Sequence, residues 1–248
     1  MSSKLRQDEI VKILGEKGYI SVKYLSDALH YSTATINRDL NDLQKRGIVT
    51  RSYGGAELVR SPYVPIMFRA QKMRSEKRHI GKCAASFVKD GDTIFIDGST
   101  TAQYMENHLI ERKGLTVITN NMMLAINLSK YNIKVICLGG PVAEPPCMLY
   151  GKETVENAER YRVNKMFFSS DGLTSDGVIA SGIFDLMLKT VAKRAKEVFY
   201  LVDHKKIDKE FCEAYGTLRE IDYVISDYDF PEDTVARFKT TKFVHADE

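Results

Sequence analysis

The amino-acid sequence predicts an α/β protein in two parts: a small winged helix-turn-helix at residues 1–58 and a larger α/β domain at residues 79–248. Three observations lead to this prediction. Short amphipathic helices precede a glycine-containing hairpin near the N-terminus, β-branched strands alternate with helices from residue 93 onward, and the two parts differ in charge. The chain has 248 residues, of which 44% are hydrophobic, so it is long enough to form two buried cores.

Three helices and a hairpin are expected in the N-terminal part. The first helix covers residues 4–18, and the helix-turn-helix covers about 20–47. Ser21 and Ser32 are suitable N-caps because a serine hydroxyl accepts a hydrogen bond from a free backbone N–H of the first turn. Residues 48–59 contain two β-prone runs joined by Ser-Tyr-Gly-Gly, which predicts the hairpin of a wing.

The helix after Ser32 has one packing face and one free face. Ile36, Leu40 and Leu43 recur at helical spacing, and polar residues occupy the other side. In a helix-turn-helix this second helix enters the DNA major groove. A plain helical hairpin has the same periodicity. The candidate DNA contacts are hydroxyls, an amide and cations that suit base edges or phosphates: Ser32, Thr33, Thr35, Asn37, Arg38 and, at the base of the wing, Arg51.

The distribution of charge favours a polyanion partner for the N-terminal part. Residues 1–82 contain 16 Lys and Arg against 8 Asp and Glu, whereas residues 83–248 contain 20 against 25. Double-stranded DNA is therefore the expected partner. Residues 59–78 lose the helical period and include Pro62 and Pro65, which predicts a linker.

Several other classes of protein receive no support. The four cysteines, Cys83, Cys137, Cys147 and Cys212, are too far apart for a CxxC clip, so we expect no metal site. The P-loop and the dinucleotide-binding glycine motif are absent, and we expect no cofactor. The sequence also lacks an apolar run of 18 residues, so we expect a cytoplasmic protein without a membrane segment.

The larger domain alternates strands and helices. Strands are expected at residues 93–97, 115–119, 134–140, 165–171, 197–203, 223–227 and 242–246, with helices at 100–110, 121–129 and 184–196 and after Pro231. This order predicts a parallel sheet covered on both faces, whose ligands bind at the carboxyl ends of the strands.

Polar residues gather at those strand ends. Asp-Gly-Ser-Thr-Thr at 97–101 enters a helix directly and outlines a phosphate cradle, although an ordinary capped turn has the same pattern. Further strand ends carry Thr-Asn-Asn at 119–121, Leu-Gly-Gly at 138–140, Ser-Ser-Asp-Gly at 169–172 and Asp-His-Lys-Lys at 203–206. Hydroxyls, amides, carboxylates and lysines at one edge suit a phosphorylated, polyhydroxylated small molecule.

The order of these residues resembles one family. S-x-x-T-I-x-R-D-L-x-x-L-x-x-x-G at residues 32–47, followed by R-x-x-G-G-A at 51–56, resembles the N-terminal domain of the DeoR family of bacterial transcription regulators. The segments IFIDGSTT, VITNN, LGG, SSDG and LVDHKK are similar to successive signatures of that family's C-terminal sensor domain, which is similar in fold to ribose-5-phosphate isomerase. The resemblance covers nearly the whole chain.

The resemblance implies a DNA-binding repressor of a sugar or polyol catabolic operon, controlled by a phosphorylated sugar. The implied effector contacts are Asp97, Gly98, Ser99, Thr100, Thr101, Asn120, Gly139, Gly140, Asp171 and Lys206, the last at the position of the family's lysine. The chain departs from the family at Asn37, where a second arginine is usual, at Tyr31, and at Lys205-Lys206-Ile207. We also expect a homodimer or homotetramer, because paired half-sites multiply affinity.

Two alternatives remain at this point. The C-terminal domain is a working isomerase or deaminase if Asp171 or Asp176 acts as a general base. The isomerases carry a stabilising lysine just ahead of a glycine-rich segment, and residues 178–182 have none, so we expect no enzymatic activity. The second alternative is an architectural DNA-binding protein with no effector.

Overall fold

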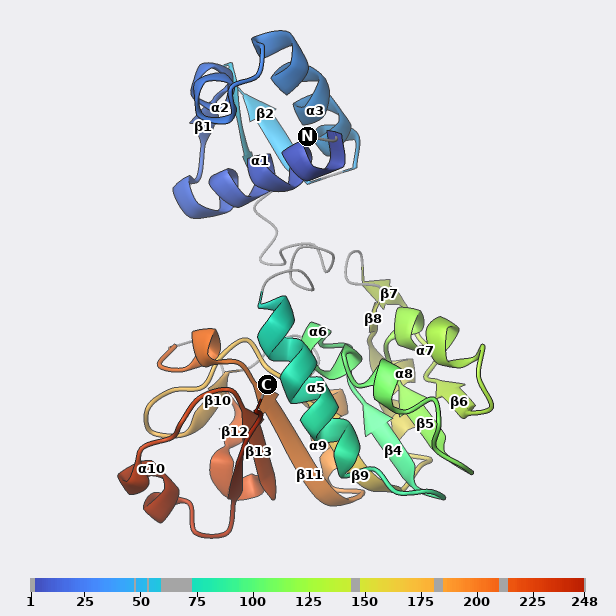
Figure 1. Ribbon diagram of the computed structural model, residues 1–248. Helices are drawn as coiled ribbons and strands as arrows, with labels where there is room; N and C mark the ends of the chain where they lie inside the picture. Colours follow the sequence, from blue (N-terminus) through green and yellow to red (C-terminus); the bar gives the residue numbers. More distant parts are fainter. Residues whose placement is uncertain are drawn as a thin grey trace. The chain divides into compact units, whose positions relative to one another are not determined.

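The computed structural model describes residues 3–46, 48–52, 54–58, 73–143, 148–180, 185–209 and 214–247. Tertiary contacts divide the chain into two units, Met1–Pro65 and Ile66–Glu248. The predicted fold class is confirmed: a winged helix-turn-helix and an α/β domain with a parallel sheet (Figure 1). Residues 59–72 of the expected linker, together with Gly47, Cys147, Gly182 and Cys212, lie outside the described residues.

The first unit contains three helices and a three-stranded sheet. Its elements are α1 (Ser3–Lys17), β1 (Ile20–Ser21), α2 (Val22–Leu29), α3 (Thr33–Lys45), β2 (Val49–Ser52) and β3 (Gly55–Leu58). The strands are ordered β1-β3-β2 and are antiparallel. The wing hairpin was expected, whereas β1, with only two residues, was not.

The predicted caps of the helix-turn-helix are confirmed. Ser21 Oγ accepts a hydrogen bond from the Tyr24 backbone at 3.1 Å, and Ser32 Oγ accepts one from the Thr35 backbone at 3.2 Å. Gly18 has a φ of 76° and follows the last residue of α1, as a helix-ending glycine does. The helices enclose a fully buried core formed by Ile10, Leu14, Leu25, Ile36, Leu40 and Leu43.

A buried carboxylate joins α1 to α3. Asp39, which is 1% exposed, accepts hydrogen bonds from Arg6 Nε at 2.5 Å, Gln7 Nε2 at 3.3 Å and Ser3 Oγ at 3.1 Å. The Arg6 guanidinium also lies 4.6 Å from the centre of the Tyr31 ring, so it stacks on the turn between α2 and α3. These contacts fix α3, the helix that carries the candidate DNA contacts.

A seven-stranded parallel sheet forms the centre of the second unit. Its order is β14-β13-β11-β9-β4-β5-β6, and every neighbouring pair is parallel. The strands are β4 (Thr93–Ile96), β5 (Thr116–Thr119), β6 (Lys134–Cys137), β9 (Val163–Phe168), β11 (Ala195–Val202), β13 (Tyr223–Ser226) and β14 (Lys242–His245). Two small hairpins pair β7 (Val142–Ala143) with β8 (Met148–Leu149), and β10 (Val178–Ala180) with β12 (Ala214–Thr217).

Helices cover both faces of this sheet (Figure 1). One hydrophobic cluster joins Ile94 and Ile96 to α5 (Arg74–Ser86), α6 (Thr100–Gln103) and α7 (Met122–Leu128). The opposite cluster joins Phe95 to α8 (Lys152–Ala158) and α9 (Asp185–Ala192). Alternate residues of a strand point to opposite faces, so a strand buried on both faces is apolar throughout.

The remaining described helices are short. Three-residue 3-10 helices occupy Glu106–His108, His204–Lys206 and Leu218–Glu220, and α10 (Glu232–Arg237) follows Pro231.

The structure corrects several expected boundaries. The helix expected at 184–196 ends at Ala192, and β11 begins at Ala195. The segment expected as a linker through residue 78 is helical from Arg74, because Lys77, Ile80 and Ala84 give α5 a buried face that the basic composition concealed. The helix expected at 100–110 is instead α6 followed by the 3-10 helix Glu106–His108. The break begins where the Tyr104 N–H bonds to the carbonyl three residues back, which tightens the turn.

Candidate functional site

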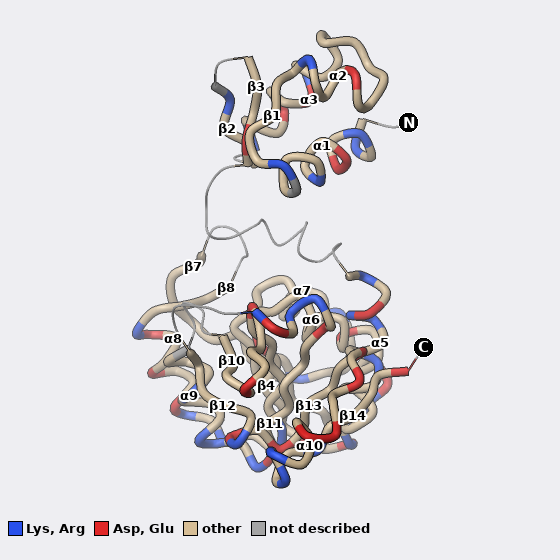
Figure 2. Tube along the Cα trace, turned by 90° about the vertical axis from the view of Figure 1, so that its left-hand side faces the viewer, with Lys and Arg blue, Asp and Glu red and all other residues tan. Residues whose placement is uncertain are grey.

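The N-terminal half of α3 carries most of the candidate DNA contacts. Arg38 is exposed, and within the described part of the chain no hydrogen bond or ion pair holds its guanidinium. Ser32 and Thr35 are bonded to each other, with 2.9 Å between their hydroxyl oxygens, and together they form the start of the helix. Figure 2 shows Lys and Arg on α1, α3 and β2 of this unit. Arg38 is thus available to a DNA ligand, while the Ser32 hydroxyl already caps the helix.

Arg51, on β2, contacts α3. Its Nη2 donates a hydrogen bond to Asn37 Oδ1, and its Nη1 donates one to Asn41 Oδ1 at 2.5 Å. Asn37 Nδ2 in turn donates to the Thr33 carbonyl at 2.8 Å. Asn41 was not among the expected contacts, although its spacing of four residues from Asn37 places both on one side of the helix. The wing and the recognition helix therefore share a polar contact.

The second unit has its topological switch point between β4 and β9. The chain adds β5 and β6 on one side of β4 and then returns to place β9 on the other side. Ligands of such sheets bind outside the carboxyl ends of the strands at this point. Asp97 follows β4, and Ser169 follows β9; the Ser169 N–H donates to Asp97 Oδ2 at 3.4 Å. The fold thus brings these two predicted segments together.

Asp97 is buried at the switch point. Its Oδ1 accepts hydrogen bonds from the Ser99 N–H at 3.1 Å and from the Ser99 hydroxyl at 2.5 Å. Burial raises the pKa of Asp97 to about 6, although the Ser99 and Ser169 hydrogen bonds and the charge of Lys206 lower it. The Asp97 carboxyl group therefore titrates near pH 6.

Two lysines reach the same edge of the sheet. Lys206 Nζ donates to Ser169 Oγ at 2.9 Å. Lys77 Nζ, from α5, donates to Thr100 Oγ1 at 3.1 Å, and Lys77 is only 3% exposed. Sequence reasoning missed Lys77 because it precedes Thr100 by 23 residues in a segment expected to be a linker. A buried ammonium group beside hydroxyls and a helix start is suited to an anion.

Three buried polar atoms near this edge lack hydrogen-bond partners among the described residues. They are Thr101 Oγ1, Asn120 Oδ1 and Asn121 Nδ2. An unsatisfied buried polar atom costs about 1–3 kcal/mol, and a ligand that supplies the missing partner recovers that cost. The other amide atoms of both asparagines are used: Asn120 Nδ2 bonds to the Leu149 carbonyl, and Asn121 Oδ1 caps α7.

Two of the three predicted glycines, Gly98 and Gly140, have packing roles. A Cβ on Gly98 would lie 1.6 Å from Met148 Sδ, so Gly98 allows the β7–β8 hairpin to approach β4. Gly140 has a φ of 130°, and a Cβ there would lie 2.2 Å from Thr154 Oγ1, which donates to the Gly139 carbonyl at 2.7 Å. Steric need explains these glycines without a ligand.

The structure places Asp171 on the surface, exposed, after β9.

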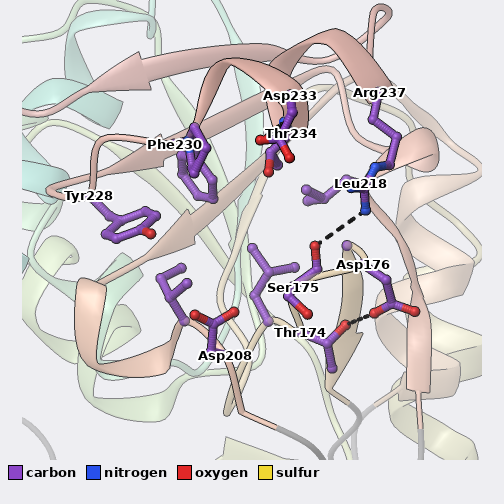
Figure 3. A pocket seen from close by; sticks show the side chains of 14 residues that line it. Thr174, Ser175, Asp176, Asp208, Leu218, Tyr228, Phe230, Asp233, Thr234 and Arg237 are labelled. Carbon is purple, nitrogen blue, oxygen red and sulfur yellow. Dashed lines mark hydrogen bonds between the residues drawn. The ribbon is translucent and has the colours of Figure 1, made fainter.

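A separate cavity of about 310 Å³ lies beside α10 (Figure 3). Its lining includes three carboxylates, Asp176, Asp208 and Asp233, and one cation, Arg237. Asp176 accepts a hydrogen bond from Thr174, and Arg237 lies near the Ser175 carbonyl. This surplus of negative charge disfavours a phosphate, whereas the switch point has lysines.

Two other kinds of site find no support in the described residues. No cluster of three or more His, Cys, Asp and Glu there is arranged to hold a metal ion. Over the same residues, no helix combines the length and apolar character that a membrane crossing needs.

Comparison with known proteins identifies the family. Residues 6–62 match the DeoR-like helix-turn-helix domain, and residues 72–228 match the DeoR C terminal sensor domain. The lactose phosphotransferase system repressor of Staphylococcus aureus (strain NCTC 8325 / PS 47) is 32% identical over 97% of this chain and 98% of its own length. The HTH-type transcriptional repressor GlcR of Bacillus subtilis (strain 168) is 33% identical over 88% of this chain and 86% of its own length.

Among solved structures, ribose 5-phosphate isomerase A of Methanocaldococcus jannaschii matches with a TM-score of 0.39 and 21% identity, over 54% of this chain and 55% of its own. The family matches cover both units, and the two full-length relatives align across them. The chain therefore belongs to the DeoR family, and it is a DNA-binding transcription regulator in which a winged helix precedes a sensor domain.

Proposed function

We propose that this protein represses a sugar or polyol catabolic operon and that a phosphorylated sugar, bound between β4 and β9, controls its binding to operator DNA. Two relatives support the repressor role, since they are named as a lactose phosphotransferase system repressor and as the repressor GlcR. The operator contacts we propose lie on α3: Thr33, Asn37 and Arg38, with Ser32 and Thr35 at the start of the helix. Arg51 reaches this helix from the wing.

The effector site rests on one observation: lysines, hydroxyls and unpartnered buried atoms occur together at one edge of the sheet. Lys77 and Lys206 already donate to hydroxyl groups there, and a phosphate would accept from ammonium and hydroxyl groups alike. The unpartnered atoms of Thr101, Asn120 and Asn121 supply donors and acceptors for sugar hydroxyls. We include Asp97, Ser99, Thr100 and Asp171 in this site.

Calorimetry with the full chain tests the effector site. We expect binding of at least one member of a panel of pentose and hexose phosphates, and no binding of the same sugars without phosphate. At a hundredfold excess over its dissociation constant, the effector adds about 2.7 kcal/mol to the free energy of unfolding. Lack of stabilisation by any sugar phosphate would instead support an architectural DNA-binding protein.

A matched pair of variants on α5 locates the phosphate. Lys77→Met should abolish effector binding while leaving DNA binding in place. Lys82→Met, which removes an exposed lysine from the same helix, should leave effector binding unchanged. Equal effector affinity in both variants would remove Lys77 from the site. Electrophoretic mobility shifts with and without effector then show whether the effector weakens or strengthens binding to operator DNA.

We propose no catalytic role for the sensor domain. Asp171 is exposed, Asp176 is bonded to Thr174, and β10, at residues 178–180, carries no lysine that would stabilise an enediolate. Homologues named as repressors agree with this proposal. Turnover of a sugar phosphate by the purified protein, followed by chromatography of the products, would show that the isomerase or deaminase alternative is correct.

A further inference from the structure

We propose that Arg51 is a positioning residue for base reading, which fixes the amides of Asn37 and Asn41 so that the exposed face of α3 presents hydrogen-bond donors to DNA. This inference rests on the proposed contact between α3 and the operator. It assigns to Arg51 a role other than a phosphate contact, and it predicts which kind of base edge the protein reads.

The orientation of the two amides follows from the chemistry of arginine. A guanidinium group has five N–H donors and no acceptor, so an amide that bonds to it must turn its oxygen toward it. Arg51 bonds to Asn37 and Asn41 at once, which fixes both oxygens on the side of the wing. The two residues are four apart, so they lie one above the other along α3.

The Asn37 amide is used at both ends. Its oxygen accepts from Arg51, and its nitrogen donates to the Thr33 carbonyl at 2.8 Å. Bidentate pairing with adenine requires both the oxygen and the nitrogen of an asparagine amide. Both groups are engaged within the protein here, so bidentate reading of adenine by Asn37 would require these two bonds to be broken or shared. Its residue type alone suggests a free amide.

Donors remain at the exposed surface. The Asn41 Nδ2 group has no acceptor within the described residues, and the Arg38 guanidinium is likewise unbonded there. A surface of donors matches a base edge with two acceptors, and in the major groove guanine offers such an edge through O6 and N7.

The wing holds Arg51 at the required position. Arg51 pairs with Ala56 in the antiparallel register of β2 and β3, so the backbone of Arg51 is fixed by the hairpin. Its side chain then spans from the hairpin to α3. Arg51 thus transmits the geometry of the wing to the residues that we propose contact the bases.

Selection from a random-sequence duplex library tests the proposal with the full chain. We expect the wild-type protein to select a site that contains G·C pairs. We then measure dissociation constants on the selected duplex, and on duplexes in which each G·C pair is replaced by A·T, at several salt concentrations. The wild type should discriminate by at least about tenfold at one or more of these positions.

Arg51→Lys separates positioning from charge. Lysine keeps the positive charge but lacks the planar fork that bonds to two amides. The variant should lose the discrimination at those positions while retaining the wild-type dependence of affinity on salt. Asn41→Ala, an exposed substitution, should weaken discrimination at the same positions. Lys45→Ala, which removes a charge from the exposed face of α3 and leaves the amides untouched, should retain it.

Several results would overturn the proposal. Unchanged discrimination in Arg51→Lys, together with a salt slope reduced by about 0.9 in Arg51→Ala, would identify a phosphate contact. Selection of adenine at the affected positions would show that the side-chain amides of Asn37 and Asn41 reorient when the protein binds DNA. If the wild-type protein selects no consensus sequence, it has no base preference that Arg51 could support, and the proposal is wrong. Effector calorimetry is independent of these measurements and reports on the sensor site separately.

Discussion

At the scale of single residues, Asp39 has the clearest structural role in the DNA-binding unit. Asp39→Ala removes the acceptor that holds Arg6, Gln7 and Ser3 and leaves the Arg6 charge unpaired beside the core. Removing one partner of a buried ion pair is costly, so we expect a loss of about 3 kcal/mol in the free energy of unfolding of this unit. Urea denaturation followed by circular dichroism measures it.

Asp42→Ala is the matched control for this substitution. Asp42 lies on the same helix and is exposed, so its removal should change stability by less than about 0.5 kcal/mol. Equal destabilisation by both substitutions would mean that lost helix charge, rather than the link between α1 and α3, accounts for the effect.

Asp97 gives the sensor domain a pH dependence of defined sign. Its pKa is raised to about 6 in the folded state from 3.8, because burial disfavours the charged form. The folded state therefore binds the proton more tightly than the unfolded state. This contribution to stability is present below about pH 4 and is lost as the pH rises through 6. The contribution of Asp97 to the free energy of unfolding that is lost over this pH range is about 3 kcal/mol.

Asp97→Asn tests this dependence because asparagine does not titrate. Between pH 4 and pH 7, the free energy of unfolding of the variant should rise relative to wild type by up to about 3 kcal/mol. Asp90→Asn is the control, since Asp90 is exposed and, among the described residues, accepts a hydrogen bond only from the Lys113 N–H. Parallel stability curves for wild type and Asp97→Asn would contradict the shifted pKa.

The residues of the candidate sites differ in how far sequence could predict them. Ser99 and Thr100 follow a strand and start a helix, a local pattern that sequence displays. Lys77 reaches Thr100 only because α5 packs beside α6, and Asn41 gains its role only because Arg51 crosses from the wing. Such contacts join distant segments, and neither spacing nor composition encodes them.

At the scale of elements, the β7–β8 hairpin is packed against the first strand end of the site. Gly98→Ala would place a methyl group 1.6 Å from Met148 Sδ, so either the Met148 side chain or the hairpin that carries it must shift. We expect a loss of about 1–3 kcal/mol in stability, as for an overpacked core, and weaker effector binding. The measurements are thermal unfolding and calorimetry.

A second substitution checks the cause. Met148→Ala in the Gly98→Ala background removes the clashing side chain, so the double variant should recover part of the lost stability. Simple additivity of the two single effects would show that the loss in Gly98→Ala does not come from the contact with Met148.

The length of an element decides whether sequence reveals it. The central strands are runs of β-branched and aromatic residues buried on both faces, and each of them was expected within a few residues. The strands of the β7–β8 hairpin have two residues each, too few for any periodicity. Helix α8 has seven residues, about two turns, and it was missed for the same reason.

At the scale of the whole molecule, the positive charge is concentrated in residues 1–82, which include the DNA-binding unit and the first residues of α5. This basic segment suits DNA, whereas residues 83–248 carry more acidic than basic side chains. One buried lysine, Lys77, and one half-buried lysine, Lys206, lie at one edge of the sheet. An effector can change DNA affinity only by the difference between its affinities for two arrangements of the protein. In such a regulator, effector binding in the second unit must therefore be coupled to DNA binding by the first unit. Oligomerisation is one way to provide this coupling.

We expect the protein to be a homodimer or homotetramer, because one winged helix buries a small interface and two heads on one duplex act at high effective concentration. Sedimentation equilibrium should give an even multiple of the 28.1 kDa chain mass. A duplex with two selected half-sites about 34–36 Å apart should bind about a hundredfold or more tightly than a duplex with one. A monomer that binds both duplexes equally would show that each head acts alone, and control by the effector would then have to act within a single chain.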